Sequence, residues 1–336
     1  MKHFIPGGAG FIGSNYIRYL LASYPEDEVI CVDALTYAGN YDNISEFEAE
    51  GRFYFEHANI CDRAEIFRLV QAYRPDCIVN FAAESHVDRS VANPEIFLKT
   101  NLLGTAVLLD AVNQFGIKRF HQVSTDEVYG DLPLDRPDLK FDEKSPIKPS
   151  SPYSASKASA DMLCAAYCRT YGTPVTISRC SNNLGPFQFP EKLIPLIIMK
   201  ALHDEALPLY GDGKNVRDWL YVEDHCRAVD QIVRNGTIGE IYNVSGNNER
   251  SNIEVVETIL DILGKPDSLI TYVKDRPGHD RRYALSSQKL QSALGWRPET
   301  GFEPAIRRTI EWYKNNPRWI ERILNDEYRK MRGVKL

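Results

Sequence analysis

The chain lacks a long apolar segment and a block of basic residues, and these absences exclude several classes of protein. No apolar run in its 336 residues approaches the roughly 20 residues that span a bilayer. Residues 1–5 read directly as a strand, without the leader and cleavage site of a secreted protein. The net charge is -6 and there is no basic stripe, which argues against nucleic acid as a partner. We therefore expect a cytoplasmic protein with no membrane partner, which could still bind a phosphate-bearing small molecule.

Cysteines and histidines are few and scattered. The seven cysteines are an odd number and most lie in apolar runs, which favours buried reduced thiols over disulfides. Cys164 and Cys168 are four residues apart, but neither a histidine nor a second cysteine pair accompanies them at metal-ligand spacing. We expect no metal site.

What the chain has in its first half is a regular alternation of short apolar runs and longer helical patterns. Such an alternation predicts an α/β fold, a Rossmann-type doubly wound parallel sheet covered by helices on both faces. The expected strands are residues 2–5, 29–32, 53–57, 77–81, 119–124 and 175–178. The expected helices are residues 11–21, 63–73, 94–114 and 151–171.

After residue 179 the pattern changes to turn-rich segments between further helices, expected at 191–202, 222–235, 253–263 and 302–315. A chain of this length usually forms two lobes. We predict a first domain over residues 1–180, which also includes about 222–245. The second domain, over 181–336, is a smaller, mixed α/β substrate-binding lobe interleaved with the first. The charged segment 319–336 is expected to be a loosely held helix.

A glycine loop follows the first strand and opens the first helix. Its glycines Gly7, Gly10 and Gly13 would permit a tight turn and let a pyrophosphate approach the backbone. The helix N-terminus would then offer free N–H groups to that pyrophosphate. Asp33 ends the second strand, at the sequence spacing from the glycine loop where an acid binds the adenosine ribose hydroxyls. Its negative charge would repel the 2′-phosphate of NADP. The loop therefore predicts NAD rather than NADP.

Tyr153 and Lys157 are four residues apart and share one face of the predicted helix 151–171. Ser151 is a plausible N-cap and Pro152 suits the first helical position, so Tyr153 would lie near the positive end of the helix. The lysine ammonium, the helix end and an oxidised nicotinamide would each favour the phenolate. The pattern thus predicts a tyrosine with a lowered pKa that acts as a base.

Two adjacent acids, Asp126 and Glu127, directly follow the predicted strand 119–124. Adjacent carboxylates in a closed site push their pKa values apart, so that one can give a proton while the other takes one. Beside a Tyr/Lys pair and a nucleotide loop, this arrangement suits elimination of water from a sugar.

Several longer motifs carry a more specific resemblance: residues 82–90 (AAESHVDRS), 124–130 (STDEVYG), 153–157 (YSASK), 181–183 (SNN), 190–195 (PEKLIP), 215–219 (NVRDW) and 278–283 (GHDRRY). Through these, the chain resembles the extended short-chain dehydrogenases/reductases and, more narrowly, the dTDP-glucose 4,6-dehydratases. The resemblance covers nearly the whole chain. It implies NAD as cofactor, dTDP-glucose as substrate, and a homodimer formed through helices such as 94–114 and 151–171.

The resemblance also implies roles for the catalytic residues. Tyr153, supported by Lys157, would take the proton from the sugar 4-hydroxyl while hydride leaves C4 for NAD, and Thr125 would hydrogen-bond that hydroxyl. Glu127 would remove the C5 proton, and a protonated Asp126 would donate to the departing 6-hydroxyl. Hydride return to C6 would then give the 4-keto-6-deoxy sugar nucleotide.

The binding residues follow from the same resemblance. The cofactor would contact Gly7, Gly10, Phe11, Ile12, Gly13, Asp33, Ala34, Leu35, Thr36, Asn59, Ile60, Phe81, Ala82, Ala83, Thr100, Tyr153, Lys157 and Asn183. The substrate would contact Ser85, Thr125, Asn182, Lys192, Leu193, Pro208, Tyr210, Arg217, Asn252, Arg276 and His279.

Some residues depart from the family pattern. Pro6 replaces a usual Thr and must fall at the very end of its strand, because proline lacks the N–H that a central strand uses. Asn59 stands where the family usually has Asp, and Leu184 and Phe187 stand where it commonly has Tyr. The loss of those hydroxyls near the substrate would bear on sugar or base preference.

Alternatives stay open at this point. The same reaction on UDP-glucose or another nucleotide hexose would use the same residues. A nucleotide-sugar 4-epimerase would use the same Tyr/Lys pair and glycine loop, but has no need of Asp126 and Glu127. A catalytically silent NAD-binding regulator would have no need of either pair.

Overall fold

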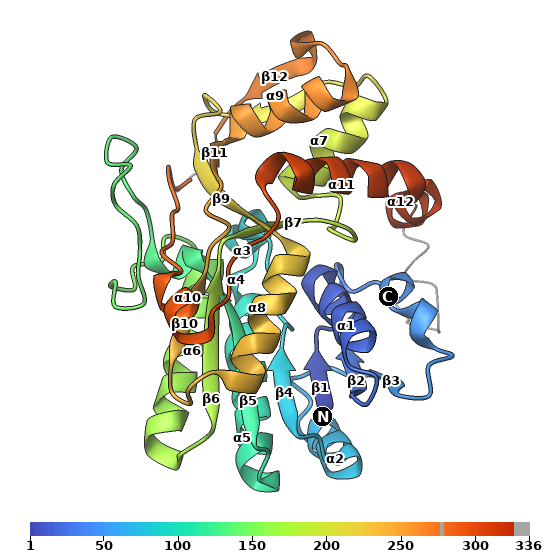
Figure 1. Cartoon of the computed structure of the whole chain (residues 1–336), viewed down its shortest axis with the longest axis vertical. Coiled ribbons are helices and arrows are strands. Elements are labelled where there is room, and N and C mark those ends of the chain that lie inside the picture. The colour runs from blue at the N-terminus through green and yellow to red at the C-terminus, as the bar shows by residue number, and fades with distance from the viewer. Residues whose placement is uncertain (276–278, 326–336) are drawn as a thin grey trace.

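The large sheet dominates the computed structural model, which describes residues 1–275 and 279–325 (Figure 1). Its seven strands run in the order β10-β6-β5-β4-β1-β2-β3, and every pairing is parallel. The predicted doubly wound parallel sheet is confirmed. The strands are β1 (Lys2–Pro6), β2 (Glu28–Asp33), β3 (Phe53–His57), β4 (Cys77–Asn80), β5 (Arg119–Thr125), β6 (Val175–Cys180) and β10 (Ile241–Val244).

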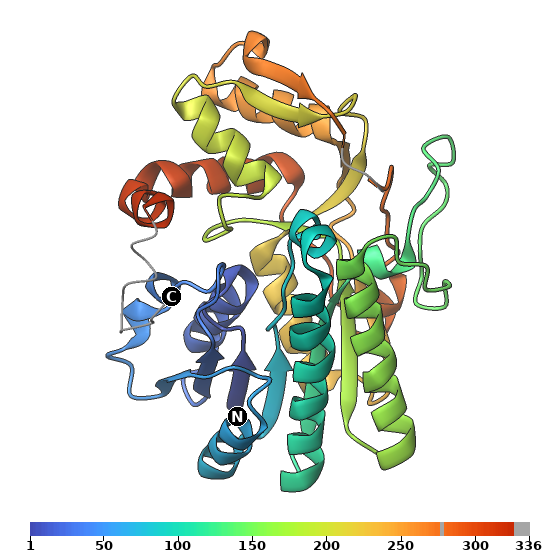
Figure 2. The same cartoon turned by 180° about the vertical axis from the view of Figure 1, so that it is seen from behind.

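Helices cover both faces of this sheet because each buries an apolar stripe against it. On the face toward the viewer in Figure 1 lie α1 (Phe11–Ser23) and α8 (Val222–Asn235), whose apolar residues pack with those of β1 and β2. On the opposite face, seen in Figure 2, lie α2 (Arg63–Tyr73), α5 (Thr105–Phe115) and α6 (Pro152–Tyr171). Since β10 pairs with β6, residues from well beyond position 180 complete the large sheet.

The helical stretch predicted over 94–114 is divided in the structure. After the short helix α3 (Val87–Ala92), it consists of α4 (Pro94–Phe97), a π-helical segment, η3 (Leu98–Gly104), and α5. The π-helical segment η3 carries Asn101, whose side chain forms hydrogen bonds with two other parts of the chain. It accepts a hydrogen bond from the backbone N–H of Glu84 at 2.8 Å and donates to the carbonyl of Glu84 and to Ser156 Oγ. The π turn thereby ties the loop after β4 to α6.

A second lobe stands over the carboxyl ends of the large sheet, at the top of Figure 1. It contains the small sheets β11-β9-β7 and β12-β8, and its core is formed by residues of α7, α9 and α11 with β8 and β9. Its strands are β7 (Asn182–Leu184), β8 (Leu207–Tyr210), β9 (Val216–Tyr221), β11 (Glu249–Ser251) and β12 (Ile270–Val273). Its helices are α7 (Leu193–Leu202), α9 (Asn252–Leu263), α11 (Phe302–Asn315) and α12 (Pro317–Leu324), while α10 (Gln288–Leu294) packs on β10 and α8.

The end of the chain is only partly as predicted. Residues 319–324 were expected in a loosely held helix, but α12 buries Trp319 and Ile323, and Trp319 Nε1 donates to Asn43 Oδ1 at 2.8 Å. The expectation was wrong for this part, because an amphipathic stripe packs against the rest of the molecule. Residues 326–336 lie outside the described residues. Within the described residues, none of the helices combines the length and the apolar character that crossing a membrane requires.

Candidate active site

A cavity of about 360 Å³ lies where the carboxyl ends of β1, β2, β4, β5 and β6 meet the second lobe. In open α/β sheets this edge is where ligands bind. All of the residues predicted to contact the cofactor line the cavity except Leu35, which is buried beside it. Leu35 was expected to contact the cofactor, but its left-handed backbone (φ 47°) turns the chain after β2, and its side chain packs in the core under α1.

The glycine loop leaves no room for a side chain at two of its positions. A Cβ on Gly7, which has φ 77°, would lie 2.4 Å from the backbone nitrogen of Ala82, and a Cβ on Gly13 would lie 2.3 Å from the carbonyl oxygen of Gly7. Helix α1 begins at Phe11, and its N-cap residue Gly10 provides no side-chain cap, so its first N–H groups face the cavity. This cradle fits the pyrophosphate of a dinucleotide.

Asp33 ends β2 at the cavity wall. Its Oδ2 accepts from the N–H of Ala9 at 3.0 Å and its Oδ1 from the N–H of Leu35 at 2.8 Å. Burial raises the pKa of this carboxyl, while the two backbone hydrogen bonds oppose the rise. Each carboxylate oxygen can accept a second hydrogen bond. Asp33 therefore has the capacity to bind ribose hydroxyls while it holds the glycine loop in place.

The segment Thr125-Asp126-Glu127 leads from β5 into a turn, and all three residues line the cavity. Thr125 is the last residue of β5, and its hydroxyl caps the 3₁₀ turn η4 (Asp126–Tyr129) by accepting from the N–H of Glu127 at 3.3 Å. Asp126 is 2% exposed, and its Oδ2 has no hydrogen-bond partner among the described residues. Burial, and then the charge of Glu127, raise the pKa of Asp126 well above its usual range. Both effects favour the protonated form of this carboxyl in the cavity wall.

Tyr153 and Lys157 project from the start of α6, where a capping box fixes the helix end. Ser151 Oγ accepts from the N–H of Ser154 at 3.1 Å, and Ser154 Oγ accepts from the N–H of Ser151 at 3.0 Å. Lys157 and the helix end do not by themselves lower the Tyr153 pKa, because burial and then the charge of Glu127 raise the pKa of the phenol. Lys157 Nζ donates to the carbonyl of Val123 at 2.6 Å, and burial lowers the pKa of its ammonium.

The predicted substrate residues fall into two groups. One group lines the cavity: Ser85, Thr125, Asn182, Lys192 and Leu193. In this group, Lys192 Nζ donates to the carbonyl of Ser85 at 3.1 Å, and Asn182 Oδ1 has no partner among the described residues. The other group lies beyond the cavity wall in the second lobe: Pro208, Tyr210, Arg217, Asn252 and His279. The predicted contact Arg276 lies outside the described residues.

Arg217 connects the second group to Asp126. Its guanidinium lies 4.2 Å from the centre of the Tyr283 ring and donates to the carbonyl of Asp280 at 2.9 Å. Its positive charge opposes the rise in the Asp126 pKa, so the two side chains are close enough to interact. Further out, the Tyr210 ring meets the His279 ring edge to face at 6.4 Å, and His279 Nδ1 pairs with Asp275 at 2.7 Å.

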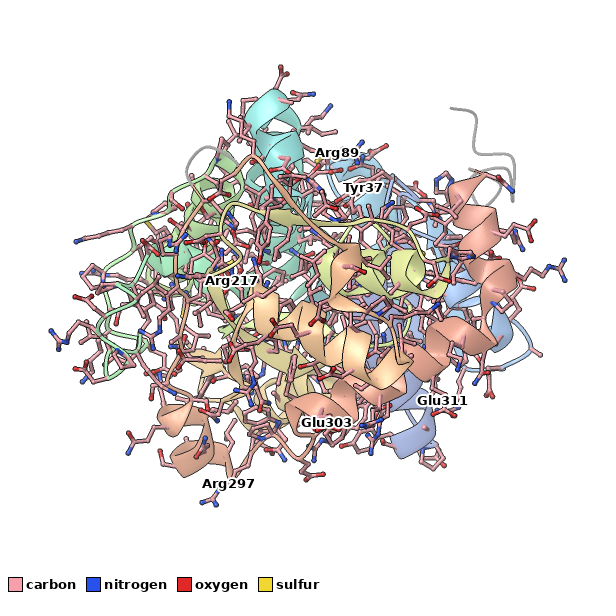
Figure 3. All side chains as sticks on the ribbon, turned by 90° about the horizontal axis from the view of Figure 1, so that it is seen from above. Tyr37, Arg89, Arg217, Arg297, Glu303 and Glu311 are labelled. Atoms are coloured by element: carbon pink, nitrogen blue, oxygen red, sulfur yellow. The ribbon has the colours of Figure 1, made fainter. Side chains whose placement is uncertain are left out.

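Sequence reasoning missed a polar cluster that also lines or adjoins the cavity. Tyr37 and Arg89 lie together in Figure 3, and the Arg89 guanidinium is 3.9 Å from the centre of the Tyr37 ring. Tyr37 also meets Phe189 from the second lobe at 5.8 Å. Glu84 and Glu191 lie nearby, and burial raises the pKa of each. Tyr37, Glu84 and Glu191 come from loops after β2, β4 and β7, whereas Arg89 belongs to α3. Glu84, Arg89 and Glu191 lie within the motifs quoted above, and Tyr37 lies in none of them.

The residues that depart from the family pattern are placed differently from one another. Pro6 is the last residue of β1, as expected from its missing N–H. Asn59 lines the cavity. Leu184 and Phe187 were expected near the substrate, but Leu184 is fully buried in the second-lobe core and Phe187 packs on Trp312 at 4.6 Å. Neither lines the cavity, because both side chains serve packing under α11.

Comparisons with known proteins agree with this geometry. The profile of the family described as "GDP-mannose 4,6 dehydratase" matches residues 4–309. The dTDP-glucose 4,6-dehydratase of Salmonella typhimurium is 48% identical, with 98% of this chain and 97% of the relative covered. The dTDP-glucose 4,6-dehydratase 1 of Escherichia coli is 49% identical with the same coverage.

Two solved structures are similar over nearly their whole length. A dTDP-glucose 4,6-dehydratase from Bacillus anthracis in complex with NAD superposes with a TM-score of 0.90 at 46% identity, covering 96% of this chain and 99% of that one. A dTDP-glucose 4,6-dehydratase from Streptomyces venezuelae with NAD and TYD bound has a TM-score of 0.92 at 46% identity, covering 96% and 100%. A UDP-glucose 4-epimerase from Thermus thermophilus is more distant, with a TM-score of 0.86 at 31% identity and coverage of 94% and 100%.

Proposed function

The chain belongs to the dTDP-glucose 4,6-dehydratase family, and we propose that it converts dTDP-glucose to dTDP-4-keto-6-deoxyglucose with loss of one water. The observation that carries this proposal is the buried Asp126, whose surroundings raise its pKa, beside Glu127 and Tyr153 in one cavity. A 4-epimerase keeps the 6-hydroxyl and would have no use for a proton donor at this position. The enzyme is therefore a hydro-lyase rather than an epimerase.

The cavity wall can hold NAD. Gly7, Gly10 and Gly13 cradle its pyrophosphate, and Asp33 binds its adenosine ribose. Bound NAD would accept hydride from C4, return it to C6 and, while oxidised, place a positive charge beside Tyr153 that favours the phenolate. The uncharged residues after Asp33 offer no partner for a 2′-phosphate.

The protein side chains would divide the proton transfers among them. Tyr153 takes the proton of the 4-hydroxyl, with Thr125 hydrogen-bonded to the same oxygen. The resulting 4-ketone makes the C5 proton acidic, and Glu127 removes it. Asp126 is protonated because it is buried, so it donates to the 6-hydroxyl, which leaves as water. Glu127 then returns its proton to C5.

The substrate would extend from the catalytic acids into the second lobe. Ser85, Asn182 and Lys192 line the cavity where the hexose would lie. Arg217, on β9 of the second lobe, interacts electrostatically with Asp126, and its planar guanidinium would suit diphosphate oxygens. Leu193, Pro208 and Tyr210 would frame the base, with Asn252, Arg276 and His279 around the ribose and phosphates.

Incubation with dTDP-glucose and with UDP-glucose, each labelled with deuterium at C4, tests the proposal by mass spectrometry. We expect dTDP-glucose to lose one water, with its deuterium found at C6 of the same molecule. An unchanged mass with inverted C4 would identify an epimerase. Bound NAD without turnover of either substrate would identify a binding protein. A faster reaction with UDP-glucose would reassign the base preference.

The protein would act as a cytoplasmic homodimer. All seven cysteines are free thiols and five are buried, as suits a reducing compartment. Large apolar side chains stay exposed on α3, α4, η3 and α6, namely Val91, Ile96, Leu98, Leu103 and Met162. An exposed apolar patch of this kind marks an interface. Sedimentation should show that Leu103→Glu and Met162→Glu favour the monomer, whereas Tyr272→Glu, at an exposed position on β12, should not.

A further inference from the structure

Helix α6 carries a third ionisable residue on the face that presents Tyr153 and Lys157. Asp161 follows Lys157 by four residues, so the three side chains form one stripe along the helix. Asp161 is 2% exposed, and its Oδ2 accepts from Arg179 Nε at 2.8 Å. Its other oxygen has no hydrogen-bond partner among the described residues. The proton transfers described above make no use of this buried acid.

Arg179 holds Asp161 from the neighbouring strand β6. Its Nη1 donates to the Tyr129 hydroxyl at 2.9 Å, and that hydroxyl donates to Asn243 Oδ1 at 2.8 Å. The guanidinium also lies 4.9 Å from the centre of the Tyr129 ring. Among the described residues, Asp161 is the one carboxylate with which Arg179 forms an ion pair. Removing two charges from water is costly, and a well-packed apolar pair of the same volume would often stabilise a fold equally well.

The surroundings of Lys157 suggest what this ion pair does. Lys157 is 4% exposed and faces Asp161 and Cys164 on its own helix, Cys180 on β6, and the Val123 carbonyl on β5. Among these groups Asp161 is the only carboxylate. Burial favours the neutral amine, and the negative charge of Asp161 opposes that effect.

We propose that Asp161, held in place by Arg179, is a positioning residue that keeps Lys157 in its ammonium form and thereby supports ionisation of Tyr153. The idea rests on the proposed function only for the role of Tyr153. Arg179 sets the strength of the effect, since it shares the charge of Asp161 with Lys157. Removal of the acid and removal of the arginine should therefore change Lys157 in opposite directions, which a merely structural ion pair would not do.

Direct titration of Lys157 tests this without substrate. Protein labelled with [ε-¹³C]lysine is titrated by NMR, and Lys157→Met identifies the Lys157 resonance. In Asp161→Asn, which keeps the size and removes the charge, the amine pKa should fall by about one unit or more. In Arg179→Gln, Asp161 faces Lys157 alone and the pKa should rise. The charge-conserving variants Asp161→Glu and Arg179→Lys should titrate near the wild type.

Kinetics provide the second readout. The alkaline limb of kcat/KM for dTDP-glucose should move to lower pH in Asp161→Asn and to higher pH in Arg179→Gln. An unchanged Lys157 titration in both variants, or shifts in the same direction, would overturn the inference. If circular dichroism shows that Asp161→Asn does not fold, Arg179→Gln alone decides, by the sign of the change in the Lys157 pKa. Failure of the proposed function would instead appear as no turnover in the wild type, while the NMR titration still applies.

Discussion

Asp126 and Glu127 are neighbours in the chain, yet the structure gives them different surroundings. Asp126 is buried, and the charges of Glu127 and Asp218 add to the effect of burial in raising its pKa. Glu127 is partly exposed at the cavity. One residue is therefore suited to give a proton and the next to take one, although both carry the same functional group.

Asp126→Asn should separate the two halves of the reaction. The amide keeps the size of the side chain but has no proton to give, so elimination should slow by about 100-fold or more. Removal of hydride from C4 should slow much less, because Tyr153 and Thr125 are untouched. Single-turnover experiments with C4-deuterated dTDP-glucose would follow oxidation and water loss separately.

Tyr153→Phe serves as the comparison for that experiment, since loss of the phenol should block oxidation and therefore both steps. An equal slowing of oxidation and elimination in Asp126→Asn would mean that Asp126 is not the acid. A raised carboxyl pKa also predicts the pH response. The rate of elimination should fall as pH rises through the pKa of Asp126, whereas the rate of oxidation should not depend on the protonation of Asp126.

Single residues show where sequence reasoning stopped. Adjacent acids and the Tyr/Lys spacing could be recognised because their positions along the chain determine their geometry. The pKa of Tyr153 could not, because it depends on how deeply α6 is buried and on the distance to Glu127. Tyr37 and Arg89 are 52 positions apart in the sequence, and no periodicity links a loop residue to a residue of α3 that stacks on it.

Helix α6 shows how a local element positions chemistry. Its capping box is matched by an equivalent box at α9, where Ser251 accepts from the N–H of Glu254 and Glu254 accepts from the N–H of Ser251. Ser151→Ala and Ser251→Ala should each lower the free energy of unfolding by about 1 kcal/mol. Only Ser151→Ala should also lower kcat, because α6 carries Tyr153 and Lys157 near its capped end.

Urea unfolding and steady-state rates would check this pair of variants. If both lose activity in proportion to lost stability, the cap has no positioning role. If neither loses stability, the boxes contribute less than their hydrogen bonds indicate.

The turn between β1 and α1 predicts a loss of cofactor affinity without loss of any side chain. Gly13→Ala would place a methyl group 2.3 Å from the carbonyl oxygen of Gly7, so the loop must move away from its cradle geometry. We expect the dissociation constant for NAD, measured by calorimetry, to rise by tenfold or more, about 1.4 kcal/mol. Gly51→Ala is the control, because nothing lies within 4 Å of its added methyl. Equal affinity in both variants would contradict the assigned role of the loop.

Among the individual elements, most strands of the large sheet and most of the helices that cover it could be predicted, since they follow from hydrophobic periodicity and helix caps. The π segment Leu98–Gly104 could not be predicted. Its residues continue a helical pattern, and the wider turn is explained only by contacts such as those of Asn101 with Glu84 and Ser156. The short strands of the second lobe were missed for the same reason, because their partners are distant in sequence.

Over the whole molecule, the chain returns to the large sheet after it has begun the second lobe. Helix α8 packs beside α1, and β10 adds to the edge at β6. At the opposite end of the strands from the cavity, α8 is joined to the loop before β2 by a buried carboxylate. Asp27 pairs with Arg234 of α8 and accepts from His3 Nε2 at 3.0 Å. Contacts of this kind join segments that are more than 200 residues apart in the sequence. Local sequence patterns could not predict them.

Asp27 therefore predicts how the folded molecule responds to acid. Burial alone would raise the pKa of this carboxyl, but hydrogen bonds from His3, the N-terminal ammonium and Arg234 lower it below the usual 3.8. A lowered pKa means that the carboxylate stabilises the fold fully above about pH 4, and this stability is lost as pH falls below that value. Asp27→Asn should lower the free energy of unfolding by about 2 kcal/mol at pH 7. The difference from wild type should shrink as pH falls below 4.

Asp212 provides the matched comparison. Hydrogen bonds from Arg281 and the backbone lower its pKa to about 2, but the pair is exposed to solvent and screened. Asp212→Asn should therefore leave stability nearly unchanged at pH 7, although both acids have lowered pKa values. Urea unfolding of the two variants between pH 3 and 8 would distinguish burial from ion pairing as the cause of the stabilisation. Equal losses in both would show that the connection of α8 to β1 does not depend on the buried charge.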